Sequence, residues 1–107
     1  MRICYLNMPM REEFRLPSLF TVCGYKIYFW SNENNEPIYV HVSKGQPVPN
    51  STKIWLTRDG GCILAENGSR IPKSELNKLM EFISAQFFLI CAEWKKFFIV
   101  DKITFYC

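Results

Sequence analysis

Short runs of aromatic, β-branched and alternating residues, separated by turn residues, fill the middle of the chain. The four runs of this kind are 25–30, 38–42, 52–56 and 62–65. The polar cluster 31–35 separates the first two runs, and Asp59-Gly60-Gly61 separates the last two, so each pair is predicted to form a hairpin. The four strands predict an antiparallel meander whose apolar face needs a cover.

A helical period replaces the strand pattern after Pro72. Apolar residues then recur every three or four positions and make one continuous stripe: Leu76, Leu79, Met80, Ile83, Phe87, Ile90, Cys91, Trp94 and Phe98. Pro72 suits the first turn of a helix, Glu75 favours its positive end, and Lys95 and Lys96 favour its negative end. The pattern predicts one long amphipathic helix that covers the sheet.

Two flanking segments complete the organisation. Residues 1–18 mix charges with prolines and show no sustained period, which predicts an N-terminal arm or extension. Residues 102–107 alternate like a strand and are expected to return to the sheet edge. The predicted fold class is therefore α+β, with a single domain at 19–107 in which a small antiparallel meander of four to five strands packs against one long helix.

The composition indicates one packed domain with more apolar residues than its core requires. The 107 residues leave no room for a second domain, and 49% are hydrophobic and 16% aromatic. Phe82, Phe88 and Leu89 lie off the helix stripe, so they either complete the core or meet a second surface. An exposed aromatic patch usually marks a contact site, so we expect a small protein partner or a homodimer.

Charge, cysteine spacing and hydropathy limit the possible binding partners and the cellular compartment. The net charge of +3 is spread along the chain, with no concentrated basic stripe of the kind that dedicated nucleic-acid binders carry. Five widely separated cysteines form no C-x-x-C pair, which favours reduced thiols over a zinc site or a disulfide framework. Charges interrupt the first 20 residues, and the apolar stretch 87–92 is too short for a bilayer, so we expect a cytoplasmic protein without membrane contact.

No cofactor loop, complete metal site or nucleophile constellation is present, and we expect no cofactor and no metal. Lys44-Gly45 lacks the other residues of a phosphate-binding loop. His41 is the single histidine. It is a candidate general acid or base if a carboxylate such as Glu33 or Glu36 orients it, although a histidine hydrogen-bonded at the sheet surface is the commoner arrangement.

Basic and aromatic residues gather on and beside the predicted strands. The basic members are Lys26, His41, Lys44, Lys53 and Arg58, and the aromatic members are Tyr28, Tyr39 and Trp55. On one shared face they would stack on and neutralise single-stranded RNA. Alternation alone does not establish that they share a face.

The chain also resembles the bacterial family called domain of unknown function 4160. The resemblance rests on 24–33, 36–42, 44–45, 53–56, 64–65 and the helix after Pro72. It implies a small bacterial protein of a toxin–antitoxin-like pair, and it implies no catalytic residue. That family commonly has His-Val-His-Val where this chain has Tyr39-Val40-His41-Val42, an exchange that a structural or partner-binding role tolerates more easily than a role for paired histidines.

These observations support one leading hypothesis and two rivals. The leading hypothesis is an interaction module that binds a small protein through exposed aromatic residues, with Trp55 and Phe88 as the candidate anchors. The enzymatic rival is a small ribonuclease or nucleic-acid-acting toxin that uses His41, assisted by Tyr39, Lys44 or Lys53. The third hypothesis is nucleic-acid binding without catalysis, which predicts strong salt dependence.

Overall fold

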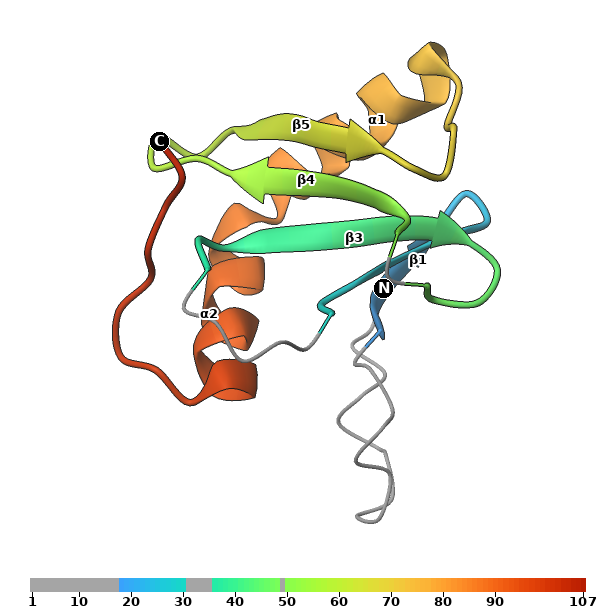
Figure 1. The fold of residues 1–107 in the computed structure, drawn as a ribbon. Coiled ribbons are helices and arrows are strands. Elements are labelled where there is room, and N and C mark those ends of the chain that lie inside the picture. The colour runs from blue at the N-terminus through green and yellow to red at the C-terminus, as the bar shows by residue number, and fades with distance from the viewer. Residues whose placement is uncertain (1–17, 31–35, 49) are drawn as a thin grey trace, which may run out of the picture.

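The computed structural model describes residues 18–30, 36–48 and 50–107. Five strands form one antiparallel sheet in the order of the chain, so the predicted meander is confirmed (Figure 1). The strands are β1 (Ser18–Val22), β2 (Tyr25–Tyr28), β3 (Tyr39–Lys44), β4 (Thr52–Leu56) and β5 (Cys62–Asn67). The extra strand is β1, whose first residue falls in the predicted arm, and the rest of that arm lies outside the described residues.

The predicted single helix is two helices, α1 (Lys73–Ala85) and α2 (Phe87–Phe98). The break falls at Gln86, whose φ of −100° and ψ of 19° leave the helical region, although its N–H still reaches the carbonyls of Phe82 and Ile83. A straight helix from Lys73 to Phe98 would be about 39 Å long, more than the 37 Å longest dimension of the fold. The break lets both halves remain on the sheet.

Both helices lie on one side of the sheet, behind it in Figure 1, and the core fills the space between. Fully buried strand residues alternate toward the helices, as the period of two requires: Ile27, Val40, Val42, Ile54 and Leu56. Ile83 of α1 and Ile90 of α2 are also fully buried and fill the core from the helical side. Phe29 meets Trp94 of α2 edge to face at a centroid distance of 5.2 Å, and Phe20 of β1 meets Phe82 of α1 at 5.1 Å.

The C-terminal segment 99–107 is not the edge strand that its alternation predicts, and that prediction is wrong. It crosses the end of the sheet, from the end of α2 to the turn between β4 and β5 (Figure 1). The N–H of Ile38 donates to the carbonyl of Thr104 at 2.8 Å, and the N–H of Arg58 donates to that of Cys107 at 2.9 Å. Ile38 precedes β3 and Arg58 follows β4, so both donors sit at one end of the antiparallel strands.

Each outer strand contains a bulge. In β1, Ser18 pairs with Tyr28 and Phe20 with Ile27, which leaves Leu19 without an opposite residue in β2. In β5, Glu66 pairs with Lys53 and Leu64 with Ile54, which leaves Ala65 without one in β4. Both edges of the sheet are therefore irregular.

Candidate functional site

The face of the sheet turned away from the helices carries aromatic side chains around one histidine. Tyr28 pairs with His41 across β2 and β3, and His41 pairs with Lys53 across β3 and β4. Tyr39 pairs with Trp55 two residues along. Residues opposite each other in register share a face. We call these five residues the aromatic face, and their register shows that they share it. Tyr39 lies at its margin, because its ring also meets that of Trp94 of α2 at a centroid distance of 5.3 Å.

His41 is buried within the aromatic face, with 6% of its surface exposed. The rings of Tyr28 and Tyr39 lie against it, at centroid distances of 5.7 and 5.4 Å. Its Nδ1 is 3.0 Å from Ser51 Oγ, which is 2.7 Å from the Tyr28 hydroxyl. That hydroxyl also donates to the carbonyl of Val48 and accepts from its N–H. His41 is thus the inner end of a polar chain that ties the loop before β4 to the sheet.

The surroundings of His41 favour its neutral form. Burial, and after it the Lys53 ammonium, lowers the pKa of His41 from 6.5 to about 4, against the opposing effect of Glu36. A general base works best when its pKa lies near the operating pH and its nitrogen can reach the substrate. Low basicity and burial therefore speak for a structural histidine, and the catalytic role of His41 stays a prediction.

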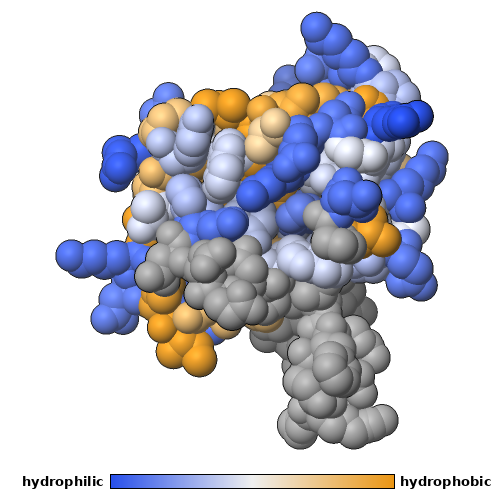
Figure 2. All heavy atoms as spheres, viewed as in Figure 1, coloured by the Kyte–Doolittle hydropathy of each residue, from blue (hydrophilic) through white to orange (hydrophobic). Residues whose placement is uncertain are grey.

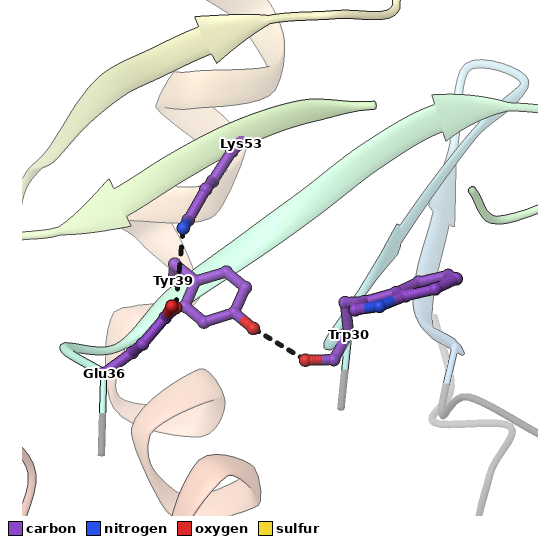
Figure 3. A network of polar contacts seen from close by, with 4 residues as sticks. All are labelled: Trp30, Glu36, Tyr39 and Lys53. Atoms are coloured by element: carbon purple, nitrogen blue, oxygen red, sulfur yellow. Dashed lines mark hydrogen bonds and ion pairs between the residues drawn. The ribbon is translucent and has the colours of Figure 1, made fainter. Parts of the chain in front are cut away.

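The Lys53 ammonium is enclosed by two rings and a carboxylate. Its Nζ lies 4.5 Å from the ring centroid of Tyr39 and 4.5 Å from that of Trp55. Glu36 Oε1 is 3.5 Å away, and Figure 3 shows the two charged groups meeting beside the Tyr39 ring. Cation–π contact and ion pairing together hold the ammonium in place. Lys53 would have to leave these partners to neutralise a phosphate.

The Tyr39 hydroxyl fastens the start of β3 to the segment after β2. It donates to the backbone carbonyl of Trp30 at 2.6 Å (Figure 3). Burial, and next the Glu36 carboxylate, raises the pKa of Tyr39, so the phenol keeps the proton it donates. Glu36, one of the two carboxylates considered for orienting His41, is instead the ion-pair partner of Lys53, and Glu33 lies outside the described residues.

Two of the residues predicted for binding lie elsewhere. Lys44 sits at the other end of β3, with Nζ 5.4 Å from the ring centroid of Tyr25, whose hydroxyl donates to Glu75 of α1 at 2.6 Å. Phe88 projects from α2 with 85% of its surface exposed. The ribonuclease hypothesis therefore has His41, Tyr39 and Lys53 together, but not Lys44.

Three residues that contribute to this region could not be identified from the sequence. Trp30 contributes a backbone carbonyl, which no side-chain pattern reveals. Ser51 is a serine among loop residues, and only the folded loop brings it to His41. Tyr106 stacks on Trp55 at a centroid distance of 5.1 Å and an interplanar angle of 7°. Its alternation with neighbours gave the single signal, and that signal predicted a strand.

Metal and thiol chemistry find little support in the part of the chain that the structure describes. No three histidine, cysteine or acidic side chains there gather at metal-ligand distance. Cys23, Cys62, Cys91 and Cys107 carry free thiols. Burial raises the pKa of Cys62 and of Cys91, which disfavours the reactive thiolate. Neither described helix has the length and apolar character of a bilayer-spanning helix.

A second surface lies on the outer side of α2 and its C-terminal end. Phe88 and Ile99 are 85% and 88% exposed, and Leu89 and Val100 are exposed beside them. We call these four residues the α2 patch. Phe88 lies in the first turn of α2 and Ile99 directly follows its last residue, about three helical turns further along the axis. Figure 2 shows an apolar group over the C-terminal end of α2.

The backbone at Ile99 is strained. Its φ of 53° and ψ of 58° are left-handed, a conformation that usually ends a helix at glycine or asparagine. A β-branched side chain there is a genuine outlier and costs roughly 1–2 kcal/mol. The chain therefore places a nearly fully exposed apolar residue at a position where glycine would be more stable.

Comparison with known proteins gives one match. The model of a family described as Domain of unknown function (DUF4160) matches residues 24–95. The matched region runs from the turn before β2 to the last turn of α2, so it contains the whole aromatic face and most of the helical layer. No protein with a curated description and no solved structure shows significant similarity to the chain.

Proposed function

Because this chain belongs to the DUF4160 family of domains of unknown function, we propose from its surface that it is a protein-interaction module that binds through the α2 patch. The observation that carries the proposal is the exposure of Phe88 and Ile99, at 85% and 88%. Burying a side chain of this size stabilises a complex by roughly 1.5–3 kcal/mol, so aromatic and aliphatic anchors of this kind dominate interface energetics.

The strain at Ile99 supports the same proposal. Strained backbone persists where the surrounding structure imposes it, and it clusters at functional positions. The α2 patch has no described neighbour that covers Ile99, so the strain brings the isolated domain no compensating packing. Contact with a partner would supply that packing.

The charges around the patch indicate the chemistry of the partner. Lys95 and Lys96 are exposed in the last turn of α2, between Phe88 and Ile99. Glu93, the single carboxylate among residues 88–100, is buried and paired with Lys96 at 3.5 Å. We therefore propose a small protein with an apolar groove and an acidic rim. A second copy of this chain would offer the patch no exposed carboxylate from its own residues 88–100.

The resemblance to the family extends the proposal to the cellular setting. It supports a bacterial cytoplasmic protein that is one member of a toxin–antitoxin-like pair. In that setting the partner is the other member, and α2 is the element that recognises it by laying its outer side into a groove. The aromatic face then has a structural role, in which His41, Lys53 and Trp55 hold the loops around β3.

Replacement of Ile99 by glycine should stabilise the domain and weaken partner binding. Relief of roughly 1–2 kcal/mol of strain exceeds the glycine entropy cost of about 0.5–1 kcal/mol, so we expect a net gain of about 0.5–1 kcal/mol in unfolding free energy. Loss of the anchor should weaken binding about fivefold or more. Urea denaturation and titration calorimetry with the purified partner measure the two effects. A variant that binds as well as the wild type would exclude Ile99 from the interface.

Capture from the native host tests the module directly. The tagged protein should retain one small acidic protein at equal stoichiometry after nuclease treatment, and Phe88→Ala should lose it. Ile63→Ala is the control, because Ile63 is an exposed apolar residue on β5, away from α2. Recovery of nucleic acid alone, or equal recovery with wild type, Phe88→Ala and Ile63→Ala, would contradict the proposal. Loss of an RNA-cleaving activity in His41→Asn would favour the ribonuclease rival.

A further inference from the structure

The C-terminal tail, residues 99–107, occupies a small binding site at the end of the sheet. Two backbone N–H groups receive it: that of Ile38 donates to Thr104 at 2.8 Å, and that of Arg58 donates to Cys107 at 2.9 Å. The acceptor carbonyls are three residues apart on the tail. An extended segment with this spacing fits the two fixed donors.

Two aromatic side chains of the tail complete the contact. The ring of Phe105 stacks on that of Phe87 at a centroid distance of 6.1 Å and an interplanar angle of 14°, and the Arg58 guanidinium lies 5.2 Å from its centroid. Tyr106 stacks on Trp55. Aromatic pairs at these distances add to the free energy that burial alone provides. The tail is therefore held by both backbone and side chains.

The site and its occupant are separate parts of the chain. The receiving residues Ile38, Trp55, Arg58 and Phe87 all lie within 24–95, the region that the family model matches, whereas the whole tail lies beyond it. The site is thus built on the sheet and the start of α2, and the tail reaches it from the far end of α2.

The link between α2 and the docked part of the tail is loosely held. Residues 99–102 are all exposed. The N–H of Val100 donates to the carbonyl of Lys95 at 3.1 Å, which caps α2 and does not dock the tail. Ile99 sets the direction of the tail through its strained left-handed backbone. Rotation of Ile99 into the right-handed region would carry the tail away from its own sheet.

We propose that two copies of this protein exchange tails, so that each sheet end holds residues 103–107 of the other copy. The second copy is the best occupant because its tail is chemically identical to the segment that already fits. All docking contacts are regained in the exchanged pair, while Ile99 is released from its strained conformation. Short hinge loops under strain favour such exchange.

Removal of Val100 and Asp101 tests the exchange. The deletion shortens the link by about 7 Å, so the tail no longer reaches its own site but still reaches that of a second copy. Light scattering should show a dimer. The same deletion combined with Phe105→Ala and Tyr106→Ala should be a monomer. A monomeric deletion variant, or a dimer that survives loss of both rings, would overturn the proposal.

The full-length chain provides a test that does not depend on the deletion variant folding. Two differently tagged wild-type preparations, mixed at high concentration, should form a co-purifying mixed dimer. Ile99→Gly should raise the dimer dissociation constant about tenfold or more, because two strained hinges are relieved in the monomers. Absence of mixed dimers at every concentration would overturn the exchange. Phe88→Ala should leave the exchange unchanged, so its result is independent of the proposed partner binding.

Discussion

Gly68→Ala is expected to lower the free energy of unfolding by about 3 kcal/mol or more, one of the largest effects of any single methyl group in this chain. A Cβ built on Gly68 would lie 1.8 Å from the carbonyl oxygen of Asn50, 2.9 Å from its carbonyl carbon and 3.1 Å from the carbonyl oxygen of Ser51. All three atoms belong to the backbone, so no side-chain rotation relieves the clash. The two segments must separate.

Separation would break a reciprocal contact beside Gly68. The N–H of Thr52 donates to Ser69 Oγ, and the N–H of Ser69 donates to Thr52 Oγ1, both at 3.2 Å. Ser69 Oγ in turn donates to the carbonyl of Val42 at 3.0 Å. These bonds join the start of β4 to the segment after β5 and to β3, so their loss spreads across three strands.

Thermal and urea denaturation measure this effect. A loss of about 3 kcal/mol should lower the Tm by more than about 10 °C in a domain of this size. Gly61→Ala is the matched control, because its Cβ would meet side-chain oxygens of Thr57 and Asp59 at 3.3 and 3.5 Å, which can move. The control should change stability by less than about 1 kcal/mol. Equal Tm values for the two variants would show that Gly68 is not a point of close backbone approach.

Acid should destabilise the protein through His41. The pKa of His41 is about 4 in the folded state and 6.5 in the unfolded state. Between pH 6.5 and about 4, His41 is protonated in the unfolded chain but not in the folded chain. The stability that neutral His41 contributes is therefore fully present above pH 6.5 and is lost as the pH falls to about 4. The loss approaches about 3 kcal/mol. Lys53 contributes to it, since a protonated His41 would face the half-buried Lys53 ammonium.

The acid effect is measurable because His41 is the single histidine. Urea midpoints at pH 7, 6, 5 and 4.5 should fall steadily in the wild type. His41→Asn keeps a polar atom toward Ser51 but cannot titrate, so its midpoints should change much less across the same range. Parallel curves for wild type and variant would mean that His41 stays solvated and titrates normally. Such a result would also reopen its role as a general base.

The strands and the helical region could be predicted because local signals and tertiary packing agree there. Between residues 25 and 98 the turn residues and the change of period mark nearly every boundary. The break at Gln86 could not be predicted, because neither glycine nor proline marks it and the apolar stripe continues through it. The strand prediction for residues 102–107 failed for a different reason. Its alternation is real, but Phe105 and Tyr106 pack against Phe87 and Trp55 at the end of the sheet rather than along a strand.

The candidate site likewise has a part that the strands predict and a part that depends on the fold of loops. Hairpin register brings His41, Lys53 and Trp55 to one face, and alternation within each strand foreshadows that grouping. The burial of His41 could not be predicted, because Ser51 and the backbone of Val48 reach the sheet only through the fold of a loop. The exposure of Phe88 likewise depends on how far α2 turns after Gln86. Propensity marks candidate residues, and the loops and the helix break decide which of them remain accessible.

The bulges in β1 and β5 determine how this sheet can grow. A regular outer strand offers an unbroken row of N–H and C=O groups, which a strand from another molecule can extend without limit, as in amyloid. Leu19 and Ala65 interrupt that row at both edges of the sheet. In a chain that is 49% hydrophobic, each bulge prevents further molecules from adding to the sheet strand by strand. Association through α2 or through exchanged tails ends with a finite complex, so this protein should remain dispersed at concentrations at which an unprotected sheet would form fibrils.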